Sequence, residues 1–310
     1  MPTEEVLALE DEGRLDDARA ACERAVAEHY DDLDVLADAA DFFVRNAETA
    51  DDNREWLERG LVLARRAQKL ARREHAEDAL LDMQVLEARA LNDAGENRDA
   101  LRAADAVLGY HPDAPDALLE RGTALYELCR FDEARTALSK AVEVAPDDPW
   151  SHRMLALVAE RLGDEEEAKR RFARVQRLAP EFEEPVHMRA DEFDRLVEAA
   201  LEDIPESVSR WLSNVPITVE ELPALEDLTA SDPPLSPSSL GMFRGAPFGE
   251  KASMDPWSHF PSSIVLYQRN LERFAKDKDE LAREIGVTLV HEVGHYLGLD
   301  EDELWERGLD

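Results

Sequence analysis

The sequence predicts a multi-domain chain in which an all-α helical solenoid is followed by a small α+β domain. Three observations lead to this prediction. Prolines recur every 34 residues at Pro112, Pro146 and Pro180, within a helical pattern of apolar residues. Beyond Pro180 the pattern changes to one amphipathic helix and several short β-type runs. A helical period then returns over 277–297, near the end of the 310-residue chain.

The first part of the chain carries two further sets of small residues at the 34-residue spacing. Small residues in one set let the two helices of a pair approach closely. The alanines of the other set follow acidic or polar turns, which suit the positive N-terminus of the second helix. The two sets are Ala88, Gly122 and Ala156, and Ala100, Ala134 and Ala168.

This pattern resembles a tetratricopeptide repeat (TPR) array over about residues 5–180. Segments 115–148 and 149–182 match it well and 81–114 less well, whereas 31–78 is irregular and predicts helices at 34–46 and 53–73. The resemblance implies a groove that presents a concave surface to a peptide or protein partner.

The second part of the chain predicts a domain at 191–310, after a repeat domain at 1–182 and a linker at 183–190. Its opening segment, 191–205, has the apolar spacing of an amphipathic helix. The β-type runs follow at 215–219, 240–244 and 264–267. Between the first two, the proline- and serine-rich segment 231–239 predicts a loop, either a flexible lid or a plain linker.

The last predicted helix carries the residues with the clearest chemistry. His291 and His295 are four positions apart, so both imidazoles project from one face of the helix. Zn²⁺ prefers such neutral nitrogen ligands and keeps an open position for water in catalytic sites. Glu292, beside the first histidine, is placed to act as the general base that takes a proton from that water.

A third ligand is expected beyond a glycine turn. Gly298 lies three residues after the second histidine, and Glu301 lies ten residues after the first, giving the spacing HExxHxxGxx(H/D/E). The spacing favours Glu301 as the third metal ligand. Asp300, Glu303 and Glu306 stay open as alternatives, Glu306 if one further helical turn forms there.

The region 191–310 resembles the small bacterial minimal zincin family of metallopeptidases. The matching features are, in order, Phe193-x-x-Leu-Val-x-x-Ala-Leu-x-x-Ile-Pro205, Asn214-Val215, Leu240-Gly-Met-Phe-Arg-Gly245, Ile264-Val-Leu-Tyr267 and the motif His291–Glu301. The resemblance implies a zincin fold and a zinc site at His291, His295 and the acid after the turn. The chain departs from the family in having Glu301 where Asp is usual, and from metzincins in lacking a methionine after that residue.

Other residues are weaker candidates. Tyr267, Tyr296 and His259 could each donate a hydrogen bond to an oxyanion. The two tyrosines are more typical of packing residues in a strand and a helix, and His259 of an exposed loop. Trp150, at a repeat boundary, is predicted to lie in the core.

Composition limits the partners and the compartment. Acidic residues number 71 and basic residues 36, so the net charge of −35 argues against nucleic acid or an anionic membrane as a partner. Cys22 and Cys129 lie in helical patterns and predict buried thiols of a reducing compartment. With no signal-like or membrane-spanning run in the sequence, a cytoplasmic location is expected.

Two functions are therefore compatible with the sequence. The favoured one is a zinc metallopeptidase that hydrolyses peptide bonds and whose TPR array recruits a substrate or partner. The alternative is a TPR adaptor whose zincin domain binds metal or peptide without turnover. Hydrolysis of a non-peptide amide also stays open. The substrate, the partner, latency and the oligomeric state are not defined by the sequence.

Overall fold

The computed structural model of the chain describes residues 2–50, 52–180, 182, 185–204, 215–245, 262–299 and 303–304. The chain divides into two compact units, Met1–Ala179 and Pro180–Asp310. Within these described ranges, no helix combines the length and the apolar character that crossing a membrane requires.

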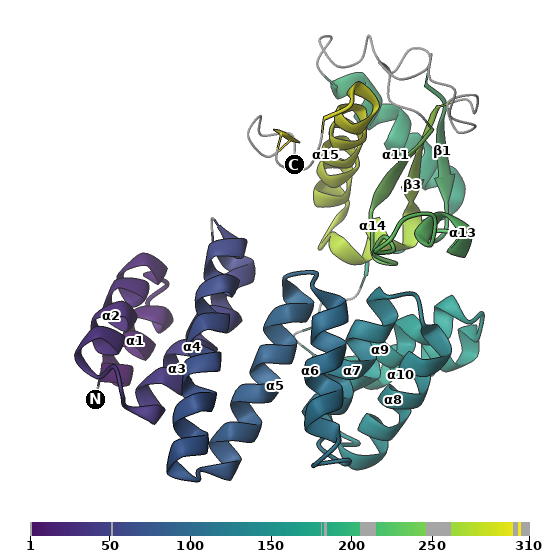
Figure 1. Ribbon diagram of the computed structural model, residues 1–310. Coiled ribbons are helices and arrows are strands. Elements are labelled where there is room, and N and C mark those ends of the chain that lie inside the picture. Colours follow the sequence, from purple (N-terminus) through teal and green to yellow (C-terminus); the bar gives the residue numbers. More distant parts are fainter. Residues whose placement is uncertain are drawn as a thin grey trace, which may run out of the picture. The chain divides into compact units, whose positions relative to one another are not determined.

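The first unit is a succession of helical hairpins in which each helix packs against the next along the chain (Figure 1). Its helices are α1 (Pro2–Asp11), α2 (Leu15–Glu28), α3 (Leu33–Asn46), the 3-10 turn η1 (Ala47–Thr49), α4 (Asn53–Glu74), α5 (Glu77–Asp93), α6 (Asn97–Leu108), α7 (Pro115–Glu127), α8 (Phe131–Val144), α9 (Pro149–Arg161) and α10 (Glu165–Leu178). The predicted solenoid is confirmed, including the longer helix pair α3 and α4.

The small residues at the 34-residue spacing bring the helices of a pair together, as predicted. Ala88 and Ala156 are fully buried. A Cβ atom added to Gly122 would lie 2.4 Å from the Cγ atom of Leu138 on α8, far inside van der Waals contact. Only a residue without a side chain therefore fits at this point of α7.

The hairpin turns share a left-handed position. Its backbone φ angle is 71° to 75° at Gly13, Gly95 and Gly163. Cys129 takes the equivalent place in the turn after α7 with a φ of 58°, and it is only partly buried, contrary to the prediction of a buried thiol. Cys22, in contrast, is buried inside α2 with 3% of its surface exposed.

Trp150 is not part of the core, contrary to the prediction. Half of its surface is exposed, and the Arg153 guanidinium lies 5.9 Å from the centre of its ring. It stands in the first turn of α9, where Ser151 and His152 occupy the buried positions. The side chain at position 150, although it lies at a repeat boundary, therefore faces solvent.

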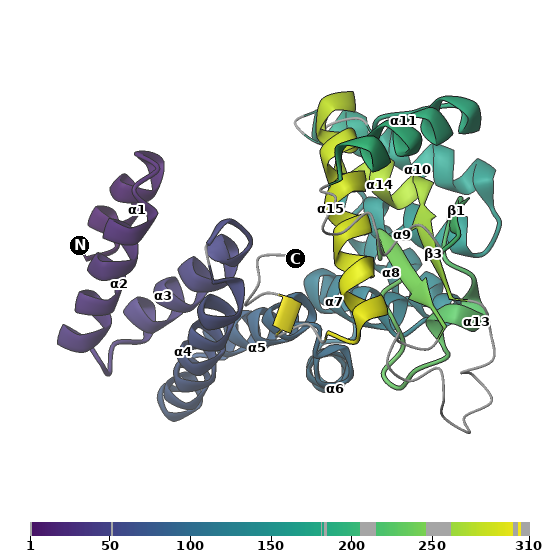
Figure 2. The same cartoon turned by 90° about the horizontal axis from the view of Figure 1, so that it is seen from above.

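In the described part of the second unit, three strands form one sheet. Helices lie against this sheet (Figure 2). The strand order is β1-β3-β2, with β3 parallel to β1 and antiparallel to β2. The predicted strands and helices are confirmed, and two short helices, α13 and α14, were not predicted. The elements are α11 (Ala190–Asp203), β1 (Ile217–Glu220), α13 (Leu225–Leu228), β2 (Gly241–Arg244), β3 (Ser263–Tyr267), α14 (Gln268–Phe274) and α15 (Lys278–Leu297).

The two faces of this sheet differ. On one face, Ile264 and Leu266 of β3 pack with α11 and α15 in the apolar core. The alternate residues of the strands point the other way. There Arg244 of β2 donates hydrogen bonds to the carboxylates of Glu220 (2.7 Å) and Asp227 (2.5 Å), joining β2 to β1 and α13.

Two segments that the sequence suggested as connectors are held by α14. In the segment predicted as a linker, the Val186 and Met188 amides donate to the main-chain and side-chain oxygens of Glu272 (3.0 and 3.1 Å). The buried amide of Asn270 donates to main-chain oxygens of the loop 231–239. Both segments thus have fixed attachments to the second unit.

Candidate metal centre

Helix α15 provides the frame of the site. The Asp277 side chain accepts hydrogen bonds from two main-chain amides and caps its N-terminus. Residues spaced four apart form a fully buried stripe toward the sheet, namely Leu281, Ile285, Leu289 and Val293. The helix ends at Gly298, whose φ of 86° reverses the chain. The side chains flanking the stripe are thereby fixed in direction.

His291 and His295 face one another across one turn of this helix. Their Nε2 atoms are 3.0 Å apart, and the ring planes meet at 84°. The Nδ1 atom of His295 lies 3.2 Å from the carbonyl oxygen of Leu299, just beyond the glycine turn. With Nδ1–H donating to that carbonyl, the lone pair of His295 Nε2 points toward His291.

This arrangement fits a bound metal ion. Zinc–nitrogen bonds of about 2.0–2.1 Å in a tetrahedral site separate two ligand nitrogens by about 3.3 Å. The observed separation of 3.0 Å is close to that value. The backbone carbonyl behind His295 is the kind of outer partner that orients a metal-binding imidazole.

Glu292 lies beside this pair and against the sheet. Its side chain is buried, with 6% of the residue exposed. A Cβ atom on Gly241 of β2 would lie 3.4 Å from Glu292 Cγ and 2.6 Å from Thr288 Cγ2. The missing side chain at Gly241 therefore lets β2 approach the helix face that carries Glu292. Among the described strands, β2 is at an edge of the sheet.

The chain beyond Gly298 returns to α15. Leu304 is fully buried, and its Cδ2 atom would lie only 2.1 Å from a Cβ atom on Gly294. The candidate ligands Asp300, Glu301 and Glu306 lie outside the described residues. Within the described part of the chain, no three His, Cys, Asp or Glu side chains, Glu303 included, come together as a metal site.

The weaker candidates divide as follows. Tyr267 and Tyr296 are buried, with 1% and 5% exposed, as expected for packing residues. The Tyr296 ring lies 5.7 Å from that of Phe243 on β2. His259 lies outside the described residues. The close contacts at Gly241 and Gly294 were not predicted from the sequence, because they depend on tertiary packing against Thr288 and Leu304.

Comparisons with known families support both halves of this description. Residues 212–309 match the family model of zincin-like metallopeptidases. Residues 85–149 and 122–182 match the tetratricopeptide repeat model. The chain joins tetratricopeptide repeats to a zincin-like metallopeptidase domain. The histidine pair and Glu292 lie within the matched zincin-like domain.

Several solved structures are similar to the chain. MamA from Desulfovibrio magneticus RS-1 is 17% identical, with a TM-score of 0.44, over 58% of this chain and 94% of that one. MamA AMB-1 is 21% identical, with a TM-score of 0.41, over 57% of this chain and 97% of that one. YrrB, described as a TPR protein with an unusual peptide-binding site, is 14% identical, with a TM-score of 0.38, over 58% of this chain and 85% of that one. No curated protein matches the chain.

Proposed function

We propose that the zincin-like domain is a zinc-dependent hydrolase of peptide bonds and that the repeats recruit its substrate or a protein partner. The observation that carries this proposal is the approach of the His291 and His295 Nε2 atoms to 3.0 Å next to buried Glu292. A histidine pair that only packs in a core needs no carboxylate beside it. A zinc-dependent hydrolytic site needs the histidine pair to bind the metal and the carboxylate to act as the base.

The metal would be held by the Nε2 atoms of His291 and His295, with Leu299 keeping His295 in the required tautomer. Glu301 is the proposed third ligand. Its neighbours support this role, because Leu299 contacts His295 and Leu304 packs at Gly294. The carboxylates of Asp300, Glu303 and Glu306 are the alternatives.

When bound, zinc supplies a Lewis acid that lowers the pKa of water toward neutrality. Glu292 accepts a proton from the attacking water and returns it to the nitrogen of the leaving amine. Burial of Glu292 keeps its carboxylate away from bulk solvent and limits its motion.

Strand β2, which lies at an edge of the sheet among the described strands, supports an extended peptide as the substrate. Its position against α15, at Gly241, places main-chain hydrogen-bonding groups near Glu292. An extended chain can pair with such an edge and present its peptide bonds in a regular row. A peptide bond is thus a more suitable target than an isolated amide.

The test compares Glu292→Gln with Glu284→Gln, a control two turns earlier on the same helix. Zinc content is measured by elemental mass spectrometry, and cleavage is measured with fluorescein-labelled casein. Glu292→Gln should keep zinc and lose cleavage by on the order of a hundredfold or more, since a general base contributes that much. Glu284→Gln should retain both.

Loss of zinc in Glu292→Gln would identify this residue as a ligand and contradict the assigned role. Stoichiometric zinc in the wild-type protein without any cleavage would instead support the adaptor function. Cleavage that persists after chelation of the metal would contradict the zinc-dependent mechanism.

A further inference from the structure

The N-terminal end of the repeats contains a pocket that the hydrolase site does not involve. It lies among α1, α2 and α3 and has a volume of about 150 Å³. Its floor is apolar and buried, formed by Val6, Cys22, Val35 and Phe42. Leu7 forms one wall with half of its surface exposed. A space of this size accommodates one side chain.

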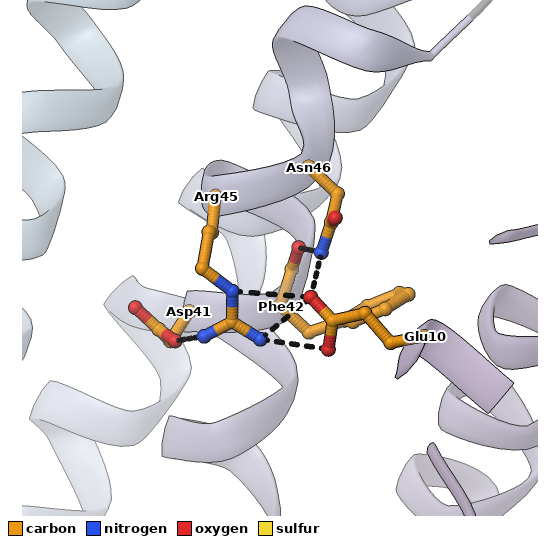
Figure 3. A network of polar contacts seen from close by, with 5 residues as sticks. All are labelled: Glu10, Asp41, Phe42, Arg45 and Asn46. Carbon is orange, nitrogen blue, oxygen red and sulfur yellow. Dashed lines mark hydrogen bonds and ion pairs between the residues drawn. The ribbon is translucent and has the colours of Figure 1, made fainter. Parts of the chain in front are cut away.

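The rim of the pocket is acidic but partly neutralised. Figure 3 shows Arg45 between Glu10 of α1 and Asp41 of α3. Its guanidinium donates a hydrogen bond of 2.9 Å to the Glu10 carboxylate and another to Asp41. Asn46 donates a further hydrogen bond of 2.9 Å to Glu10. These two carboxylates therefore already have partners.

Asp38 is the remaining carboxylate of the rim. It makes no hydrogen bond or ion pair with any other residue that the structure describes. Burial first, and then the nearby Asp34 and Asp41, raise the pKa of the Asp38 carboxyl group above its ordinary value. The Arg45 guanidinium, which is bonded to Glu10 and Asp41, lowers this pKa and offsets the rise only in part. The acidic lining residues of the pocket therefore outnumber its cation, and a second cation would stabilise the Asp38 carboxylate.

The floor beside Asp38 has low polarity. Burial raises the pKa of the Cys22 thiol to about 12, since the thiolate is poorly solvated there. A ligand with an anionic group would be repelled by the rim. A purely apolar ligand would cover Asp38 and leave its charge without compensation, which is costly.

We propose that this pocket binds the side chain of a lysine or arginine within a basic segment of a protein partner or substrate. The aliphatic stem would lie along Leu7 and Phe42, and the cationic end would pair with Asp38. The charge of −35 on the chain favours the approach of such a segment. The inference rests on the proposed recruiting role of the repeats and names the chemistry that they recognise.

The probe is a fluorescein-labelled Gly-Ser dodecapeptide with Lys-Leu-Lys at its centre, titrated with the full-length protein by fluorescence anisotropy. A matched peptide carries norleucine in place of both lysines, which keeps the stems and removes the charges. The protein variants are Asp38→Asn, Leu7→Ala and the control Asp16→Asn. Asp16 lies in the first turn of α2, outside the pocket lining, so its loss changes the net charge equally.

The lysine peptide should bind saturably to the wild-type protein, and the norleucine peptide about tenfold more weakly. Asp38→Asn should weaken binding of the lysine peptide about tenfold and Leu7→Ala severalfold, whereas Asp16→Asn should stay within twofold. Since Asp38 makes no hydrogen bond or ion pair with another described residue, its variant should keep the fold, which circular dichroism verifies. Absent binding, or equal weakening by Asp38→Asn and Asp16→Asn, overturns the proposal.

Binding is measured with and without chelator, so that it is separate from hydrolysis. Asp38-dependent binding in a protein that cleaves no casein supports the pocket and contradicts only the hydrolase function. Casein cleavage together with peptide binding that is unchanged by Asp38→Asn contradicts only the proposed pocket. In an active enzyme, Asp38→Asn should raise KM for a lysine-rich substrate and leave kcat unchanged.

Discussion

Glutamine in place of Glu120 should stabilise the repeats at neutral and alkaline pH. Glu120 of α7 is only 9% exposed, and its carboxylate accepts a hydrogen bond of 2.8 Å from the Asn92 side chain. Burial is the main cause that raises the pKa of its carboxyl group from about 4.5 to about 7, with Asp93 adding to the shift. A glutamine can accept the same hydrogen bond from Asn92 without carrying a charge.

The direction of the pH dependence of stability follows from the number of protons bound in the folded and unfolded states. Between the two pKa values the unfolded chain has released the proton while the folded protein keeps it, so stability falls as the pH rises. A shift of the pKa from about 4.5 to about 7 lowers the free energy of unfolding by about 3 kcal/mol at a pH well above 7. Over pH 5.5 to 8, wild-type stability relative to Glu120→Gln should decrease by about 2 kcal/mol.

Urea unfolding of the full-length protein, followed by circular dichroism at several pH values, measures this difference. Subtracting the variant from the wild type removes the contributions of the other carboxyl groups. Glu143→Gln, an exposed position on α8, serves as the control and should give a difference that is independent of pH. A flat difference for Glu120→Gln as well would refute the assignment of a buried proton to Glu120.

The other predictions concern the metal and one turn. His291→Ala and His295→Ala should each abolish the binding of one zinc ion per chain, measured by elemental analysis; unchanged metal content would contradict the histidine ligands. Glu301→Ala should weaken zinc affinity by on the order of 10–100-fold or more in a chelator competition, and Asp300→Ala much less; the reverse order would make Asp300 the ligand. Cys129→Gly should raise the free energy of unfolding by about 0.5–1 kcal/mol, because its φ of 58° suits glycine; a lower urea midpoint would show that the thiol contacts matter more.

Much of the fold follows from local sequence patterns. The 34-residue spacing predicts the repeat helices because each close helix contact needs a small residue, as at Gly122 against Leu138. The apolar period of α15 predicts both the buried stripe and the shared face of His291 and His295. Spacing along one helix suffices for these relations, since the helix itself fixes the geometry.

Relations between distant segments were not accessible in this way. Helix α14 is short and has no apolar period, yet its Asn270 and Glu272 are buried and bind main-chain groups of other segments. Glu120 occupies a helix position that looks solvated in the sequence, but it is buried where α7 packs in the repeats and bonds to Asn92 of α5. Trp150 shows the opposite case, an aromatic residue that packing leaves half exposed.

The attachment of the segment before α11 has a mechanical consequence. Met188 is bonded to α14 twice, through its amide to Glu272 and through its carbonyl oxygen to Gln268. Gln268 directly follows β3, the middle strand of the described sheet. Tension applied to the chain from the repeats, for example by a captured protein being pulled, would load these hydrogen bonds before it reached α11. The zincin-like domain would therefore meet such a load first at α14, beside its central strand.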